Sequence, residues 1–400
     1  MQKEVSATSH KILFINTLAF TVCFAVWMIN GVLVTYLTTN QVFDWGAIEI
    51  GWLMGIPVLT GAIFRLPAGM LTDKFGGKPI FGTLLFICAV PMFLLSYAND
   101  FISFALCSFG FGLAGASFAI GIAFTSAWYP KRLQGTVLGI FGAGNAGAAL
   151  TTFFAPTMLN TFTANGENIE GWRMLPKVYA AVLVIIGIVF FLFAENKKSA
   201  VSNKTWIKML TPLKNTRVWR FGFYYFLVFG CFVAFSQWLV PYFVNVYYMS
   251  LVTAGIFAAL FSFPSGVIRA LGGLLSDKLG ARKVMYWILG SSTLISFMLI
   301  VPKMDIYSPG EGIMAQRPGI VTKVSATEID VEGKKYLLQV KPTTFENLDE
   351  QVLVFPTKEV WQESVVDEGQ KVQKKELLAK GVTRIYFQAN VWIFAVLVIL

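Results

Sequence analysis

The chain has 400 residues, of which 56% are hydrophobic and only 14% are charged, and its mean hydropathy is +0.64. Charged residues make up about 25% of an ordinary soluble domain, so this composition excludes a soluble globular protein and favours one embedded in a bilayer. The formal net charge of +10 does not indicate nucleic-acid binding, because the basic residues gather in alternate loops between apolar runs. The sequence shows no nucleophile–base set, phosphate-binding loop or metal-ligand cluster, which argues against an enzyme.

Apolar runs long enough to cross a hydrocarbon core of about 30 Å recur along the chain. They predict an all-α polytopic membrane protein. The predicted spans cover residues 13–36, 47–70, 80–98, 102–127, 133–155, 176–194, 220–245, 250–273 and 284–302. A tenth span begins near residue 387 and is still apolar at Leu400, so we expect the sequence to be part of a longer protein.

Basic residues distinguish the two sides of this predicted membrane protein. They cluster after the second, fourth, sixth and eighth spans, whereas the opposite loops contain acidic residues: Asp44, Asp100, Glu167 and Glu170. Because Lys and Arg are enriched in cytoplasmic loops, we expect the N-terminus to lie inside the cell. The N-terminal segment lacks a short apolar region with a small-residue cleavage site, so the first span is expected to remain as an anchor.

Two arginines lie inside predicted spans, and each begins a copy of the same motif. The copies read Arg65-Leu-Pro-Ala-Gly69-Met-Leu-Thr-Asp73-Lys74-Phe-Gly76 and Arg269-Ala-Leu-Gly-Gly273-Leu-Leu-Ser-Asp277-Lys278-Leu-Gly280, offset by 204 residues. Such a parallel repeat predicts two helical bundles related by an axis along the membrane normal. The repeated glycines allow close helix approach. The charged Asp-Lys pairs at the helix ends predict contacts that form in one conformation and break in another.

The depth of the two arginines predicts an anion site. Arg65 precedes Asp73 by eight residues, or about 12 Å of helix, which is too deep for easy snorkelling to the cytoplasmic face. An arginine near the middle of a membrane helix costs at least ~2.5–3.5 kcal/mol on insertion scales. The acidic residues lie at span ends or in loops, so none offers these arginines an internal ion pair. Because a guanidinium is a planar fork of donors suited to planar oxyanions, we expect Arg65 and Arg269 to share one anion.

The fifth span is rich in glycine. It contains Gly135, Gly139, Gly142, Gly144 and Gly147 within thirteen residues. Glycines at this density remove side-chain bulk and let a helix backbone approach a partner helix or a ligand. Asn145 is the strong side-chain donor in this stretch. Helix packing alone would explain the glycines, but the amide among them favours an added contact with a substrate.

A polar segment, residues 303–386, interrupts the second half of the chain. Its strand-like runs are separated by turn residues such as Glu332-Gly333 and Glu368-Gly369, which predicts an inserted β-rich domain. Nine crossings from an inside start would place this domain in the periplasm. The run 366–381 faintly resembles a biotinyl/lipoyl-type barrel, but the Met-Lys-Met modification site of that family is missing, so no cofactor is expected. The sequence therefore predicts five parts along the chain. They are a six-helix bundle (1–194), a cytoplasmic linker (195–219), the first part of a second bundle (220–302), the inserted domain (303–386) and the start of a tenth helix (387–400).

These motifs together resemble the nitrate/nitrite porter family of the major facilitator superfamily. The repeated Gly-x-x-x-Asp-Lys-x-Gly loop resembles that of the superfamily, and the Gly-x-Gly-Asn-x-Gly stretch of span five resembles the nitrate signature of the porters. The resemblance implies a two-bundle fold of twelve spans. It also implies that the anion is bound by Arg65, Arg269 and Asn145, with aromatic residues Phe118, Tyr225 and Phe229 around it and with signature glycines Gly139, Gly142, Gly144 and Gly147. The conformational-switch loops would contain Gly69, Asp73, Lys74, Gly273, Asp277 and Lys278.

The function implied by the resemblance is transport of nitrate and nitrite across the bacterial inner membrane, as part of nitrate assimilation, by a monomeric protein without metal or cofactor. Two arginines repel each other when no anion is bound, which disfavours closure of the empty carrier and favours exchange. Proton coupling usually needs a titratable group in the pathway, yet the only histidine, His10, precedes the first span. Nitrate/nitrite antiport is therefore preferred to proton-coupled nitrate symport. Transport of another small anion, such as a carboxylate, and a receptor with the β-rich domain as sensor are the other interpretations.

Overall fold

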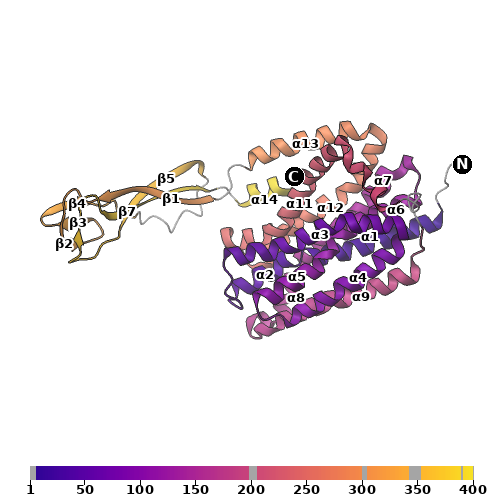
Figure 1. Ribbon diagram of the computed structural model, residues 1–400, viewed down its shortest axis with the longest axis horizontal. Helices are drawn as coiled ribbons and strands as arrows, with labels where there is room; N and C mark the ends of the chain where they lie inside the picture. Colours follow the sequence, from indigo (N-terminus) through magenta and orange to yellow (C-terminus); the bar gives the residue numbers. More distant parts are fainter. Residues whose placement is uncertain (1–5, 198–204, 300–303, 342–352, 389–390, 400) are drawn as a thin grey trace. The chain divides into compact units, whose positions relative to one another are not determined.

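The computed structural model describes residues 6–197, 205–299, 304–341, 353–388 and 391–399 (Figure 1). The chain divides into a helical unit that comprises Met1–Ser291 and a second unit that begins at Ser292 and contains the strands. The predicted boundary at residues 302–303 and residues 198–204 of the predicted linker lie outside the described residues.

Eight helical runs in the described chain are long and apolar enough to cross a membrane, and they coincide with the first eight predicted spans. They are Ala7–Thr39, Ala47–Phe75, Gly77–Tyr97, Phe101–Trp128, Lys131–Phe162, Ile169–Phe193, Thr216–Tyr247 and Leu251–Leu279. Large apolar side chains such as Phe14, Ile48 and Leu192 lie exposed on these helices, as expected of a surface that faces lipid.

The helices of this unit pack side by side (Figure 1). Their bounds are α1 (Ala7–Trp27), α2 (Asn30–Thr39), α3 (Ala47–Phe75), α4 (Gly77–Leu94), α5 (Phe101–Gly112), α6 (Ser117–Trp128), α7 (Gln134–Gly142), α8 (Gly147–Phe162), α9 (Met174–Phe193), α10 (Trp206–Met209), α11 (Thr216–Tyr247) and α12 (Leu251–Leu279). Helix α12 of the second half packs on α7 and α8 of the first half, and α11 packs on α2. The two halves therefore meet along α12 and at α11, whose buried residues lie between Phe229 and Val244.

Three spans are interrupted partway along their length. Span one breaks between α1 and α2, and spans four and five each contain a 3₁₀ segment, Leu113–Ala116 and Ala143–Ala146. Both 3₁₀ segments lie in glycine-containing sequence, and glycine weakens a helix interior. A change from α to 3₁₀ hydrogen bonding alters which carbonyl groups are available to side chains.

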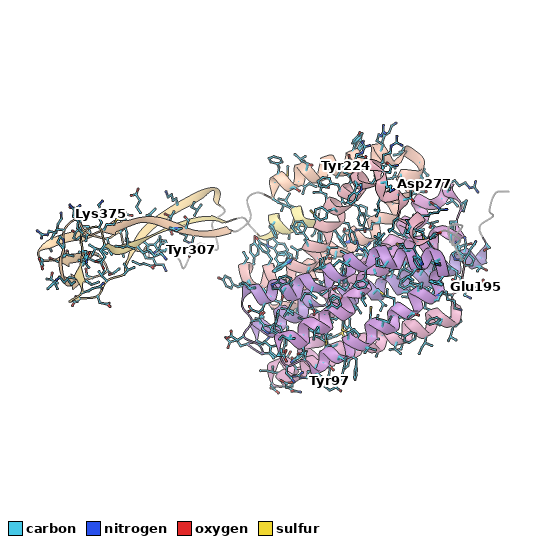
Figure 2. All side chains as sticks on the ribbon, in the orientation of Figure 1. Tyr97, Glu195, Tyr224, Asp277, Tyr307 and Lys375 are labelled. Atoms are coloured by element: carbon cyan, nitrogen blue, oxygen red, sulfur yellow. The ribbon has the colours of Figure 1, made fainter. Side chains whose placement is uncertain are left out.

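The repeat found in the sequence is also a repeat of structure. Helices α3 and α12 both contain 29 residues, and their first and last residues keep the offset of 204 positions. Each helix ends at a glycine with a positive φ, 93° at Gly76 and 91° at Gly280, a conformation in which glycine is favoured. Figure 2 shows Asp277 and Glu195 at the same end of the helical unit, with Tyr97 at the opposite end.

The predicted ninth and tenth spans correspond to α13 (Ala281–Met298) and α14 (Val391–Ile399). Neither is among the eight helices of the described chain that are long and apolar enough to span a membrane. The count of nine spans and a partial tenth therefore stays a prediction.

The inserted segment folds as β-structure, as the sequence predicts. One antiparallel sheet has the order β1 (Met304–Met314), β7 (Leu377–Gln388), β5 (Leu353–Ser364). The other has the order β4 (Lys334–Leu337), β3 (Glu328–Val331), β2 (Gly319–Val324), β6 (Lys371–Val372). Glu332 and Gly333 both have positive φ values, 47° and 81°, as a two-residue type I′ hairpin between β3 and β4 requires. Figure 2 shows Tyr307 on the long strands and Lys375 near the smaller sheet.

Two lysines on neighbouring strands of the small sheet hold the carboxylate of Glu328. Hydrogen bonds from Lys323 and Lys335, each 3.2 Å from a carboxylate oxygen of Glu328, lower the pKa of Glu328 below its ordinary value. Because the pKa is lower in the folded state, the stabilisation is present above the ordinary carboxyl pKa and is lost as the pH falls through the folded one.

We expect proteolysis of the β unit within the full chain to accelerate on acidification, because protonation of Glu328 removes this stabilisation. The Glu328→Gln substitution should remove part of that acceleration. An unchanged acid dependence in Glu328→Gln would contradict this.

Candidate functional site

The two predicted arginines meet at one phenylalanine ring. Arg65 projects from α3 and Arg269 from α12, and their guanidinium carbons lie 4.8 Å and 5.5 Å from the centroid of the Phe229 ring. Both arginines are half-buried, and Phe229 is buried. Within the described residues, no ion pair joins either arginine to a carboxylate. Two positive groups from equivalent helices therefore share one aromatic neighbour, and neither is paired with a carboxylate of the described segments.

The backbone of span four holds Arg65 in place. Its Nε donates a hydrogen bond of 3.1 Å to the carbonyl oxygen of Gly115, which lies in the 3₁₀ segment between α5 and α6. Gly115 has no side chain to obstruct the approach, and a Cβ there would collide with the Trp27 ring. The break in span four thus supplies both the acceptor and the space for this contact, and the bond does not use the two terminal nitrogens of Arg65.

The predicted aromatic residues form a stack beside the arginines. The rings of Tyr225 and Phe229 on α11 lie 4.9 Å apart with an interplanar angle of 13°, and Phe118 of α6 stacks on both at 5.9 Å and 5.5 Å. The guanidinium of Arg65 lies 5.8 Å from the Phe118 ring. Cation–π contacts of this kind stabilise a desolvated guanidinium without neutralising its charge.

Two further aromatic residues were missed by the sequence analysis. The Trp27 ring lies 5.4 Å from the guanidinium carbon of Arg65, and the Phe232 ring lies 4.9 Å from that of Arg269. Phe232 follows Phe229 by three residues, so both lie on one face of α11, and this spacing is the signal that was available. Trp27 lies in an apolar span and gave no comparable signal.

Asn145 lies deep in the protein but does not bind either arginine in this structure. Its side chain is fully buried in the 3₁₀ segment of span five. The Nδ2 group donates to the carbonyl oxygen of Gly142 at 2.6 Å, and Oδ1 has no hydrogen-bond partner. The predicted donor is thus engaged within its own helix. Its role in binding an anion stays a prediction.

The four signature glycines divide between two neighbouring helices. A Cβ at Gly139 would press on the backbone carbonyl of Arg269, and one at Gly142 would lie 3.4 Å from Cδ of the Arg269 side chain. Gly144 and Gly147 face the other way, where Cβ atoms would meet Phe20 and the backbone of Thr21 on α1. Span five is therefore packed closely on both sides, and one of these sides fixes the position of Arg269.

Asp277, one of the predicted switch residues, joins the two halves. Its carboxylate accepts hydrogen bonds from the backbone N–H groups of Gly135 and Thr136 at 3.1 Å and 2.7 Å, and from the Thr136 hydroxyl at 2.8 Å. These N–H groups lie in the first turn of α7, which has no side-chain cap of its own. A carboxylate at a helix N-terminus satisfies such unpaired donors and interacts favourably with the helix dipole. Asp277 thus caps a helix of the opposite half.

The other predicted switch residues lie in different surroundings. Asp73 lines a pocket with residues of the linker and the start of α11, among them Lys208 and Thr216. The Nζ atom of Lys74 lies 4.1 Å from the Trp206 ring. A Cβ at Gly273 would press on the Gly135 carbonyl, whereas one at Gly69 would meet only Ala119, at 3.9 Å. Lys278 is exposed. The second copy of the motif therefore lies at the contact between the halves.

In the part of the chain that the structure describes, no group of three or more His, Cys, Asp and Glu side chains could hold a metal ion. The four cysteines, at positions 23, 88, 107 and 231, are unpaired thiols. Independently of this, two guanidinium groups on an aromatic stack can bind an anion through charge-assisted hydrogen bonds.

Comparison with known proteins identifies one family model and several relatives that are similar to this chain. The model of the Major Facilitator Superfamily matches residues 15–313. The "Probable nitrate/nitrite antiporter NarK1" of Thermus thermophilus is 41% identical over 301 residues, which cover 74% of this chain and 68% of that protein. The "Nitrite extrusion protein" of Bacillus subtilis (strain 168) is 31% identical over 314 residues, which cover 78% of this chain and 76% of that protein.

A solved structure has a similar fold. It is that of a bacterial homolog to the human lysosomal transporter Spinster in an inward-facing and occupied conformation, with a TM-score of 0.55 and 19% identity. The match covers 74% of this chain and 68% of that chain. At this identity the similarity concerns the fold alone.

The contact between Gly139 and α12 can be tested through stability. We expect Gly139→Ala to lower the stability of the full chain by about 1–3 kcal/mol, because the added methyl overpacks a helix contact. The matched control is Gly272→Ala on α12, where nothing lies within 4 Å of the added Cβ. Thermal unfolding in detergent, followed by tryptophan fluorescence, measures both variants. Equal midpoints for the two variants would contradict the close approach.

Proposed function

This chain belongs to the major facilitator superfamily and, within it, to the nitrate/nitrite porters, and from this premise we propose that it exchanges nitrate for nitrite across a bacterial plasma membrane. The names of its relatives, a nitrate/nitrite antiporter and a nitrite extrusion protein, support both the substrates and the exchange. The observation that carries the proposal is the contact of Arg65 and Arg269 with the single ring of Phe229.

The proposed site uses both guanidinium groups to hold one anion. Arg65 donates through Nε to the Gly115 carbonyl and also forms a side-chain hydrogen bond with Tyr225, so the donors that remain on its terminal nitrogens can bind the oxygens of a planar anion. The Tyr225 phenol interacts electrostatically with both arginines and can donate to the same anion. Asn145 adds a further donor when Nδ2 leaves the Gly142 carbonyl. Aromatic rings and glycine-rich backbone lie beside the arginines, which supports a small anion rather than a bulky one.

Repulsion between the arginines couples binding to movement in the proposed cycle. Two like charges held close together in a medium of low dielectric constant repel strongly, so the halves resist closing around an empty site. A bound monovalent anion offsets this repulsion and lets the halves close and reopen on the other side. Because the empty carrier crosses slowly, the cycle favours exchange. Within the described spans, the carboxylates lie near the span ends, at Glu49, Asp73, Glu170 and Asp277. A transported proton therefore has no carboxylate to bind in the middle of these spans.

The location of the chain follows from the same proposal. The alternating basic loops support a cytoplasmic N-terminus, with Asp277 and Glu195 at the cytoplasmic end. The inserted β unit would then lie in the periplasm, and the protein would act as a monomer.

The role of the guanidinium fork is tested by conservative substitution. We expect Arg65→Lys and Arg269→Lys each to weaken nitrate binding about tenfold or more, because an ammonium keeps the charge but loses the planar pair of donors. Arg217→Lys, at an exposed position on α11, should bind nitrate as the wild type does. Isothermal titration of the purified full chain with nitrate measures the affinities. Wild-type nitrate affinity in Arg65→Lys would show that Arg65 does not bind the anion. In a separate titration, competition by formate and oxalate would show whether carboxylates bind.

Exchange is tested by flux. We expect proteoliposomes loaded with nitrite to take up nitrate much faster than vesicles without internal anion. Fast nitrate uptake into nitrite-free vesicles, driven by a pH gradient alone, would contradict exchange and indicate proton symport.

A further inference from the structure

The halves of the protein touch on both sides of the arginine pair, and the two contacts differ in strength. Asp277 follows Arg269 by eight residues on α12, and Gln237 follows Phe229 by eight residues on α11. Because α11 and α12 are consecutive helices joined by a short turn, these residues lie in opposite directions from the site, each about 12 Å away along its helix. Asp277 has strong partners across the interface, and the partners of Gln237 are weak.

The contact around Gln237 depends on the absence of a side chain at Gly31. A Cβ at Gly31 on α2 would lie only 2.7 Å from the backbone carbonyl oxygen of Gln237. Pro241 has no N–H to donate to this carbonyl four residues earlier, so the oxygen lacks its usual helical partner and faces the first half. Helices α2 and α11 therefore meet at a point where a carbonyl oxygen approaches a glycine.

The side chain of Gln237 is buried without adequate hydrogen bonds. It is 2% exposed. Its Nε2 donates to the sulfur of Met54 on α3 at 3.3 Å, and its Oε1 has no hydrogen-bond partner. A thioether is a weak acceptor, and a buried amide oxygen without a donor costs about 1–3 kcal/mol. Closing this contact therefore costs free energy, because the Gln237 amide loses its hydrogen bonds to water and gains only a weak one to Met54.

The first half provides a fixed surface for this contact. Pro57 leaves the carbonyl of Leu53 without its helical donor, and Nδ2 of Asn30 donates to that carbonyl at 2.7 Å and to the Ser108 hydroxyl at 3.0 Å. Asn30 thereby ties the start of α2 to α3 and α5. Opening at this end would separate α11 from α2 and also the start of α12 from α8, where a Cβ at Gly255 would press on the Thr152 carbonyl oxygen.

We propose that Gly31, Met54 and Gln237 form a gate at the end of the site opposite Asp277, and that this gate is the weaker of the two. Three hydrogen bonds to the Asp277 carboxylate close the other end. The empty carrier therefore rests open at the Gln237 end, which is the periplasmic end by the charge pattern of the loops. The inference rests on the proposed alternating access and adds to it the residues of one gate and the resting orientation.

The gate is tested by measuring the distance between α2 and α11 with two spin labels. Labels at Thr39→Cys and Asn245→Cys, both exposed near the ends of their helices, are placed on the full chain after replacement of the native cysteines. Double electron–electron resonance in lipid nanodiscs without nitrate should show mainly the longer of two distances. Gln237→Met, which removes the unpaired amide and keeps the volume, should raise the ratio of short to long distances about tenfold.

A second variant at the same contact should act in the opposite direction. Gly31→Ala clashes with the Gln237 carbonyl only when the gate is closed, so it should lower the proportion of the short distance. Gly55→Ala on α3, where nothing lies within 4 Å of the added Cβ, should leave the distribution unchanged. A short distance that dominates in the wild type, or a Gln237→Met variant that does not favour the short distance, would overturn the proposal.

Adding nitrate separates this proposal from the proposed function. Nitrate should shift the wild-type distances toward the short one if the arginines hold it. An unchanged wild-type distribution in nitrate would contradict the anion site, whereas the opposite effects of Gln237→Met and Gly31→Ala in nitrate-free buffer would still support the gate.

Discussion

The packing of two guanidinium groups against the ring of Phe229 is the interaction on which the rest of the structure depends. Each arginine carries an insertion cost of at least ~2.5–3.5 kcal/mol in a membrane, and none of the described carboxylates pairs with it. The aromatic rings and the Gly115 carbonyl reduce this cost in part. In the proposed function, the remaining positive charge selects an anion and disfavours closure of the empty site.

The glycines of span five allow the second arginine to reach this position. Gly139 and Gly142 face Arg269, so the backbone of α7 approaches α12 closely on one side of the site. Further along α12, Asp277 caps the first turn of α7. The same helix pair thus positions Arg269 and, further along, joins the two halves through Asp277. In the proposed function this arrangement links anion binding at Arg269 to the contact between the halves.

The sequence was sufficient to predict eight helices that are long and apolar enough to span a membrane, the β-structure of the inserted segment and the equivalence of α3 and α12, because each can be read from patterns along the chain. Apolar length sets the spans, alternation and turn residues set the strands, and the repeated motif sets the matching helix ends at Gly76 and Gly280. The site residues came from the arginine pair and a family resemblance. Their binding roles stay predictions.

Other features could not be read from the sequence because they depend on contacts between distant segments. Trp27 and Phe232 look like any other apolar residues until the helices pack. The Gly115 carbonyl becomes an acceptor through a 3₁₀ segment that periodicity does not reveal. The division of the glycines between α12 and α1, and the weak partners of Gln237, likewise follow from which helices are neighbours.

A double-mutant cycle for nitrate binding tests the central claim most directly. Arg65→Lys, Arg269→Lys and the double variant would be compared by titration of the purified full chain. If both arginines hold the same anion, the losses of binding free energy should be strongly non-additive, with a coupling of roughly 0.5–3 kcal/mol. Additive losses, or loss confined to one arginine, would show that the two guanidinium groups do not act on one anion and would contradict the account.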